Sequence, residues 1–410
     1  MNAKAPEPIK LNPNKPLSLI DKHFIAHRWE YYKYLREQMP VHKVKMMGIN
    51  LTVVARYEDC LMVAKDNELF GRDRAAITGG SKLPFPVPKN IQLLANSMII
   101  EDDPQHRRLR QLVQKAFAPR SLELMEERLG EWAKALVDDC GDKGEFYAQS
   151  DFALQLPSKA ISMMMGIDED DMPLFQESLR VLSEGMSGWR VARTMFWDLR
   201  KSVAFVRDQV EKKRANPGED ILSALIHAEE DGDRLTEDEL VSMVFLLIVA
   251  GFETTTSLIS NSIITFNHHP DQLERLHNEP RLLSSAVEEL LRFAGPIHGT
   301  KMNYARQDME LRGVHIPKGT AVMPLLGSAN RDETVFEDPD RFDIARDPNK
   351  HLSFSQGNHF CLGAFLARME TKIALETLYE RFDKLEFVDK PEVAPMPGWY
   401  RYKDYRVRPA

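Results

Sequence analysis

The stretch from residue 235 to 269 restricts the fold of this chain more than any other feature. Thr236 and Glu239 fit a capping box that begins a helix, and Pro270 ends it. About 32 residues at 1.5 Å each make a helix of roughly 48 Å, and its middle is apolar on most faces. Its longest apolar run is shorter than the about 20 residues that a membrane span needs. We therefore expect one long helix that crosses the core of a mainly helical protein with small β-sheets.

Weaker patterns predict further elements around this helix. The spacing of apolar residues predicts a strand at 51–56 that runs into a helix, a helix at 281–293, a small β-sheet within 308–324 and a helix at 362–382. The chain contains no internal repeat and no convincing linker. We expect a flexible N-terminal segment at 1–20 and a single domain at 21–410.

Charge and cysteine content exclude two classes of function. The 62 acidic residues outnumber the 54 Lys and Arg, and the net charge of −8 argues against a nucleic-acid-binding protein. Cys60, Cys140 and Cys361 are too far apart in sequence to form a clustered zinc site. Their odd number fits a reducing compartment and leaves one thiol for a special role. The N-terminal residues lack an apolar export segment, so we expect a soluble, cytoplasmic protein without a membrane anchor.

The sequence around Cys361 differs from that of an ordinary packing cysteine. Cys361 lies where a loop enters a helix, and helix N-terminal amides stabilise a thiolate. Gly357 and Gly363 would let the backbone approach a ligand plane, and Phe354 would shield the sulfur. A thiolate ligand to haem iron needs these features. A buried free cysteine is the alternative that this segment alone leaves open.

A polar segment interrupts the apolar middle of the long helix. Glu253 and Thr254 follow Ala250-Gly251, and a buried carboxylate is costly unless it has a partner. The Thr254 hydroxyl can bond back to the carbonyl of residue 250, which bends a helix. Leu246, Ala250 and Thr254 share one face. We interpret the segment as room for a small bound molecule beside a proton relay, the alternative being a polar contact with another helix.

Two further patterns carry charge. Glu289 and Arg292 are three residues apart and, judged by helical periodicity alone, lie on an ordinary solvated face. His106 and Arg110 are four apart in a basic stretch that contains no acid, so one helix face can present both to an anion such as a pair of carboxylates. A basic face that serves only solubility is the alternative for the second pattern.

Taken together and in this order, these motifs resemble the cytochrome P450 family, and the chain looks most like its soluble bacterial members that act on polyketides and related natural products. The resemblance covers nearly the whole chain and implies a fold in which the long central helix crosses haem b. It implies Cys361 as iron ligand and Glu253 and Thr254 as the acid–alcohol pair that delivers protons during O₂ activation. It also implies a buried triad and a propionate-binding set, which are respectively Glu289, Arg292 and Arg341, and His106, Arg110 and His359.

The chain departs from the family pattern at two positions. Asn303 stands where the family usually has an arginine that binds a propionate, so Lys301 or Arg306 is a candidate to replace it. Ser355 stands where a glycine is usual, which we interpret as a small change at a tolerant position.

The resemblance further implies a monomeric monooxygenase that hydroxylates or epoxidises a mid-sized lipophilic substrate such as a polyketide, terpenoid, steroid or fatty acid. Electrons would come indirectly from NAD(P)H through ferredoxin and its reductase, or through flavodoxin, docked near Arg107, Arg108 and Lys115. His298 and Lys301 would contact a polar or acidic substrate group or lie on the surface. The alternatives are a haem-thiolate peroxygenase or isomerase that uses peroxide, and a non-catalytic haem-binding protein. The pocket would be lined by the loop between 77 and 98 and by Leu246, Val249, Ala250, Ile297, Gly299 and Trp399.

Overall fold

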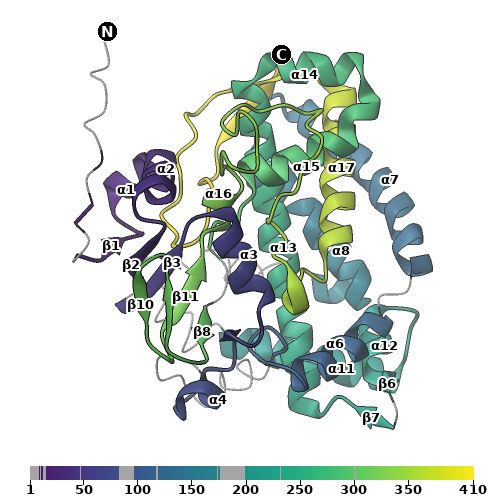
Figure 1. The fold of residues 1–410 in the computed structure, drawn as a ribbon. Coiled ribbons are helices and arrows are strands. Elements are labelled where there is room, and N and C mark those ends of the chain that lie inside the picture. The colour runs from purple at the N-terminus through teal and green to yellow at the C-terminus, as the bar shows by residue number, and fades with distance from the viewer. Residues whose placement is uncertain are drawn as a thin grey trace.

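The fold divides into a helical part and a sheet part that meet along a central helix (Figure 1). The computed structural model describes residues 9, 11–12, 15–46, 48–82, 97–116, 119–172, 174–175, 199–230, 232–299 and 302–410. Its helices are α1 (Lys22–Ala26), α2 (Arg28–Gln38), α3 (Tyr57–Lys65), α4 (Arg74–Thr78), α6 (Gln105–Ala116), α7 (Pro119–Lys143), α8 (Gln155–Met165), α11 (Leu199–Ala215), α12 (Ile221–His227), α13 (Glu237–His268), α14 (Pro270–Asn278), α15 (Leu283–Ala294), α16 (Leu326–Ala329) and α17 (Ala364–Arg381).

The strands are short and most belong to one sheet. They are β1 (Leu17–Ser18), β2 (Val41–Met46), β3 (Ile49–Val54), β4 (Phe70–Gly71), β5 (Phe146–Tyr147), β6 (Glu229–Glu230), β7 (Asp233–Arg234), β8 (Asn303–Ala305), β9 (Met309–Leu311), β10 (Val314–Ile316), β11 (Ala321–Pro324), β12 (Leu385–Phe387) and β13 (Arg406–Pro409). The largest sheet has the order β1-β2-β3-β11-β8-β4. Its last pair is antiparallel, with Phe70 opposite Ala305 and Gly71 opposite Tyr304.

The long central helix is present as predicted. α13 has 32 residues, and its start carries the full capping box between Thr236 and Glu239. Pro270 begins the next helix, α14, because proline is accepted at a first helical turn but not in a helix interior. α13 packs against α8, α11, α15 and α17, which bury nearly all of its second half. This packing makes it the axis of the main hydrophobic core.

α13 is also the one helix of the described residues that is long and apolar enough to cross a membrane. Within its most apolar window, however, 67% of the residues are buried against other parts of the protein. The helix therefore has the burial of a core helix. In Figure 1 it lies between the other long helices and the sheet strands β3, β11 and β8.

Most of the weaker element predictions are confirmed. β3 leads into α3, α15 contains all but the first two residues of the predicted helix at 281–293, and α17 ends at Arg381. Within 308–324, β9 and β10 form a hairpin, whereas β11 joins the main sheet. The prediction of a flexible segment at 1–20 is wrong at its end, because Leu17 and Ser18 pair in parallel with Val44 and Lys45 of β2. The end of the segment expected to be flexible is thus part of the sheet.

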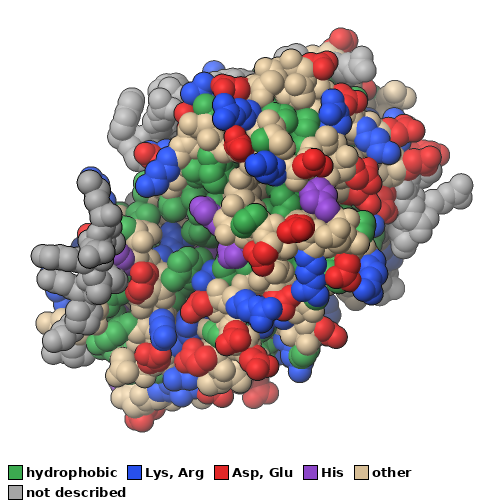
Figure 2. Space-filling model, turned by 90° about the horizontal axis from the view of Figure 1, so that it is seen from above, with side chains coloured by type: hydrophobic (Ala, Val, Ile, Leu, Met, Phe, Trp, Pro, Cys, Tyr) green, Lys and Arg blue, Asp and Glu red, His purple; other side chains and the backbone are tan. Residues whose placement is uncertain are grey.

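The surface charge is mixed where one face of the molecule is seen from above. Figure 2 shows basic and acidic side chains interspersed there, with apolar side chains between them. The net charge of −8 is therefore not gathered into one acidic patch on this face.

Candidate active site

The loop before α17 holds Cys361 in a fixed backbone turn. The Cys361 amide donates to the carbonyl of Phe354 at 2.9 Å, and the Phe360 amide donates to the carbonyl of Gly357 at 3.0 Å. Gly357 has φ +74°, and a Cβ there would lie 2.5 Å from the Ala64 carbonyl oxygen of α3. Gly357 therefore lets the loop pack on α3, and its expected approach to a ligand plane stays a prediction. Gly363 has open space beside it, as that expectation requires.

Cys361 is the exposed member of the three cysteines, since Cys60 and Cys140 are buried. Desolvation by the dense packing on its other sides nevertheless raises the pKa of the Cys361 thiol. The Gly363 amide and the charges of Arg110 and Arg368 act in the opposite direction. The helix N-terminus alone thus does not lower this pKa, contrary to the sequence expectation. A stable thiolate here needs a further cation at the sulfur, which is what a haem iron supplies.

Phe354 and its neighbour Ser355 form the inner wall of the same loop. Phe354 is nearly buried, and the Arg368 guanidinium lies over its ring at 4.5 Å. Ser355 has φ +60°, and its buried hydroxyl has no hydrogen-bond partner. The left-handed conformation is costly for any residue but glycine. The position is therefore not tolerant, and the serine is strained there.

A buried ion-pair network lies behind this loop. Glu289 and Arg292 are 0% and 2% exposed, and two hydrogen bonds of 2.7 and 2.8 Å join them. The prediction from periodicity that Glu289 and Arg292 lie on a solvated face is therefore wrong. The burial that the resemblance implied for them is present. The prediction that the Arg341 side chain completes the triad is wrong, because this side chain is 63% exposed. Only the Arg341 carbonyl joins the network, as an acceptor for Arg292 at 3.1 Å. Arg346 takes its place, because its Nε donates to Glu289 at 3.2 Å.

Asn330 connects this network to the cysteine loop. Its carbonyl accepts from Arg292 at 2.9 Å, and its side-chain oxygen accepts from the amide of Leu352 at 2.7 Å. Its amide nitrogen donates to the Ser353 hydroxyl at 2.8 Å. The network therefore fixes the two residues that precede Phe354.

Four basic side chains meet beside the cysteine loop. The rings of His106 and His359 are 4.1 Å apart, and Arg110 donates to the carbonyls of Asn358 and Phe360 at 3.2 and 2.8 Å. Burial lowers the pKa of His106, of Arg110 and of His359, the last to about 2. Arg72, which the sequence reasoning missed, contributes to the lowering for both histidines.

This cluster fits an anionic group. The nearby acids are already engaged: Asp103 contacts His106 and Arg107, at 3.3 and 3.0 Å, and Asp102 pairs with Arg306 at 2.6 Å. Buried cations are costly without a partner. The two propionates of haem would supply the missing negative charge, so the residues present fit this cofactor. The Arg306–Asp102 pair also makes Arg306 unsuitable as the replacement for the arginine missing at Asn303, and Lys301 lies outside the described residues.

The segment of α13 around Thr254 is open on one face. The Thr254 hydroxyl donates to the Ala250 carbonyl at 2.7 Å, as predicted. Ala250 is exposed and Leu246 and Val249 are only partly buried, although the helix lies in the core. Gly251 faces another way, since a Cβ there would meet Ile161 of α8 at 3.2 Å. The small residue on the open face is therefore Ala250.

Two buried partners of this segment were not foreseen. Glu253 is buried and forms an ion pair with Arg401 from the C-terminal loop. Glu370 of α17 is 1% exposed, and one of its oxygens has no hydrogen-bond partner. Burial raises the pKa of Glu370 to about 8, against a hydrogen bond from Thr255. A neutral carboxyl group thus lies next to the polar break in α13.

The remaining predicted pocket residues come from two segments that meet. Ile297 pairs with Trp399, and Gly299 pairs with Leu325, in isolated bridges, and all three pocket residues are partly exposed. The predicted surface position of His298 is wrong, because the residue is 2% exposed. Its ring packs beside that of Tyr400, with ring centroids 5.0 Å apart. It neither lies on the surface nor shares the exposure of its two neighbours. Most of the loop between 77 and 98 lies outside the described residues.

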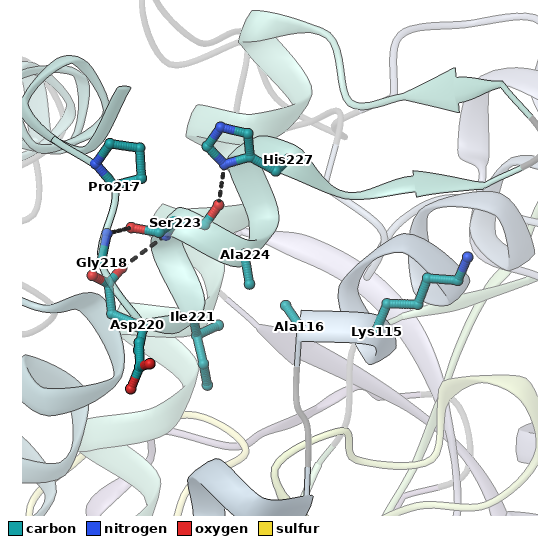
Figure 3. Close-up of a pocket in the computed structure, with 10 residues that line it drawn as sticks. Lys115, Ala116, Pro217, Gly218, Asp220, Ile221, Ser223, Ala224 and His227 are labelled. Carbon is teal, nitrogen blue, oxygen red and sulfur yellow. Dashed lines mark hydrogen bonds between the residues drawn. The ribbon is translucent and has the colours of Figure 1, made fainter. Parts of the chain in front are cut away.

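A separate hollow lies between the end of α6 and the start of α12 (Figure 3). Its polar groups are used locally, since Ser223 accepts from the Gly218 amide at 2.9 Å and Asp220 accepts from the Ser223 amide at 2.8 Å. His227 bonds to the Ser223 carbonyl at 2.8 Å. Asp220 caps α12, and Lys115 of the expected redox-partner face is among the residues that line the hollow.

Arg108 is less available for a redox partner than the sequence suggested. It forms ion pairs with Asp233 and with Glu239, at 2.8 Å to the latter. Arg107 is 71% exposed and pairs with Asp103 at 3.0 Å.

Replacing Arg346 or Arg341 by alanine tests which of the two side chains stabilises the buried network. We expect Arg346→Ala to lower the free energy of unfolding by about 2–4 kcal/mol, because Glu289 and the carbonyls of Glu337, Asp338 and Arg341 lose a donor. Arg341→Ala is the matched control and should change it by no more than about 0.5 kcal/mol. Denaturant unfolding of both variants measures the difference. Equal losses would contradict the assignment of Arg346.

A second prediction concerns Ser355. Ser355→Gly should raise the free energy of unfolding by about 1 kcal/mol, because glycine accepts φ +60° and no buried hydroxyl remains without a partner. Gly357→Ala should act with the opposite sign, since its Cβ would clash with Ala64. Thermal unfolding of the two variants measures whether stability rises in the first and falls in the second. A Ser355→Gly variant less stable than the wild type would contradict the claim that Ser355 is strained.

The buried Glu370 predicts a pH dependence of stability. Its pKa is 4.5 in its ordinary state and about 8 in the fold, so between these values unfolding releases a proton. The contribution of Glu370 to stability therefore falls as the pH rises through this window. Glu370→Gln stays neutral, and its stability relative to the wild type should increase from pH 5 to pH 8 in denaturant titrations. Parallel pH profiles would show that the carboxyl group does not titrate in this way.

Comparison with known proteins agrees with this geometry. A family model described as Cytochrome P450 matches residues 158–399. Cytochrome P450 107B1 of Saccharopolyspora erythraea is 37% identical and covers 92% of this chain and 93% of its own. The 6-deoxyerythronolide B hydroxylase of the same organism is 36% identical, and the match covers 88% of this chain and 90% of the hydroxylase. The structure of the bacillaene polyketide synthase cytochrome P450 PksS of Bacillus subtilis has a TM-score of 0.87 at 32% identity and covers 96% of this chain and 99% of its own.

Proposed function

Because the chain belongs to the cytochrome P450 family, whose monooxygenases use haem iron and O₂, we propose that its candidate active site oxidises a mid-sized lipophilic molecule. The observation that carries this proposal is the open apolar face of α13, which presents Leu246, Val249 and Ala250 next to Thr254. Apolar side chains with few polar groups are typical of pockets for such ligands. Polyketides, terpenoids, steroids and fatty acids all have this chemistry.

The residues of the cysteine loop and of α6 would hold the cofactor. Cys361 would bind the iron through its sulfur, and His106, Arg110 and His359 would bind the propionates. When bound, haem with a thiolate ligand supplies the chemistry that activates O₂. Phe354, with Arg368 over its ring, would shield the sulfur from water on one side.

Thr254 and Glu253 would move protons on the substrate side. The Thr254 hydroxyl donates to the Ala250 carbonyl at rest, which leaves its oxygen lone pairs free to accept. The Glu253 side chain is 11% exposed and is held by Arg401, so it keeps a route for proton exchange with solvent. These two adjacent residues would thus link the open face of α13 to water.

The redox partner and cellular location follow from the family reading. Ferredoxin with its reductase, or flavodoxin, would pass on electrons from NAD(P)H, and the exposed Arg107 on α6 is a basic group that an acidic partner could meet. We place the enzyme in the cytoplasm, as its cysteine content favours.

Replacement of Thr254 tests the function. In the presence of a lipophilic compound that gives a low-spin to high-spin Soret shift, Thr254→Ala should bind haem normally. We expect it to yield roughly tenfold less product per NAD(P)H, with peroxide formed instead, because a positioned proton donor is lost. Thr256→Ala is the matched control, since its buried hydroxyl has no partner to lose.

Unchanged coupling in Thr254→Ala would contradict the proton-delivery role. Product formed with peroxide, but not with NAD(P)H and redox partners, would instead identify a peroxygenase.

A further inference from the structure

Strand β8 has no basic residue at its first position. Asn303 begins β8 and offers a short neutral side chain where the resemblance implies an arginine. We propose that Arg72 takes this part and binds a carboxylate of the cofactor from the neighbouring strand. The inference rests on the proposed function, because it concerns how the same site holds haem.

Arg72 directly follows the last residue of β4, Gly71, beside the strand that begins with Asn303. In the antiparallel pair of β4 and β8, Phe70 faces Ala305 and Gly71 faces Tyr304. Continuing this register by one residue sets Arg72 opposite Asn303. Residues directly opposite each other in antiparallel strands project to the same face of the sheet. An arginine at 72 thus leaves the sheet beside the point where an arginine at 303 would leave it.

The Arg72 guanidinium is buried with unused hydrogen-bonding capacity. The residue is 7% exposed, and its Nε is buried without a partner among the described residues. Its side-chain hydrogen bond within the described residues is a long one, 3.4 Å from Nη1 to the Ile99 carbonyl. A guanidinium has five N–H donors in a planar fork that matches a carboxylate. Arg72 therefore has donors left for an anionic ligand.

The neighbours of Arg72 are themselves basic. The positive charge of Arg72 lowers the pKa of both His106 and His359, whose rings are in contact. The charge of Arg110 has the same effect on both histidines. Desolvation lowers the pKa of Arg72 to about 10, although Asp102 opposes this change. Buried like charges repel one another unless an anion joins them. Arg72 and Arg110 are the permanently charged members of the cluster, and two guanidinium groups suit two carboxylates.

Asp102 fixes the backbone from which Arg72 projects. It accepts from the Arg72 amide at 2.7 Å and also pairs with Arg306 at 2.6 Å. Gly71 leaves room for this pair, because a Cβ there would lie 2.5 Å from atoms of both side chains. Arg306 therefore positions Arg72 through Asp102 instead of binding the cofactor itself.

Haem retention and reduction potential test the proposal. The variants are Arg72→Ala, Arg72→Lys and the double variant Arg72→Ala/Asn303→Arg. Arg74→Ala is the control, since this nearby guanidinium donates to the Ser81 carbonyl at 2.7 Å. The rate of haem transfer from each holoprotein to excess apomyoglobin is measured, together with the potential of the bound haem.

We expect Arg72→Ala to release haem roughly 10- to 100-fold faster, because a charge-assisted hydrogen bond is lost. Its potential should fall, since a positive charge near the haem is removed. Arg72→Lys should lie between Arg72→Ala and the wild type, and the double variant should recover both measures. The recovery separates a ligand-binding role from a structural one, because the new arginine comes from the other strand.

Two outcomes would overturn the proposal. Arg72→Ala that matches Arg74→Ala in release rate and potential would exclude Arg72 as a ligand-binding residue. A double variant with no recovery in either measure would refute the equivalence of positions 72 and 303. A wild-type protein that purifies without haem would instead refute the proposed function, and the inference with it.

Discussion

The buried pair of Glu289 and Arg292 is the interaction on which the rest of the site depends. Both charges are removed from water, which is costly unless every lone pair and N–H group finds a partner. The chain meets this cost by wrapping backbone around the pair: Arg292 binds three carbonyls, and Glu289 accepts from the Asp343 amide. The segments that satisfy the pair are those that lead into the cysteine loop. The geometry around Cys361 is thus a consequence of satisfying one ion pair elsewhere.

α13 has to satisfy two opposing requirements. Its second half is buried on nearly all sides and stabilises the helical core. Its middle keeps an open face at Ala250 and a hydroxyl and a carboxylate next to it. The polar break is supported from two directions, by Arg401 on Glu253 and by Glu370 near Thr255. Function is therefore placed where the core can supply partners for groups that would otherwise destabilise it.

Sequence rules predicted what depends on near neighbours in the chain. The capping box of Thr236 and the bond from Thr254 to Ala250 both span four residues or fewer, and both are present. The same rules failed for Glu289 and Arg292, because the groups that bury them are distant carbonyls. Arg346 replaced Arg341 for the same reason, since only the folded loop shows which side chain turns inward. Arg72 and Arg401 join the site through strand register and a C-terminal loop, and no local pattern marks either of them.

The distribution of these contacts along the chain bears on how the protein is made. Arg28 of α2 binds the carbonyl of Trp399, 371 residues away, and Glu253 binds Arg401. β13, at Arg406–Pro409, completes the sheet that begins with β5. During synthesis, the residues before Trp399 are made without any of these partners. The contacts of Arg28 and Glu253 with this loop can therefore form only once residues 399 and 401 have been made, and the earlier helices have to fold without them until then.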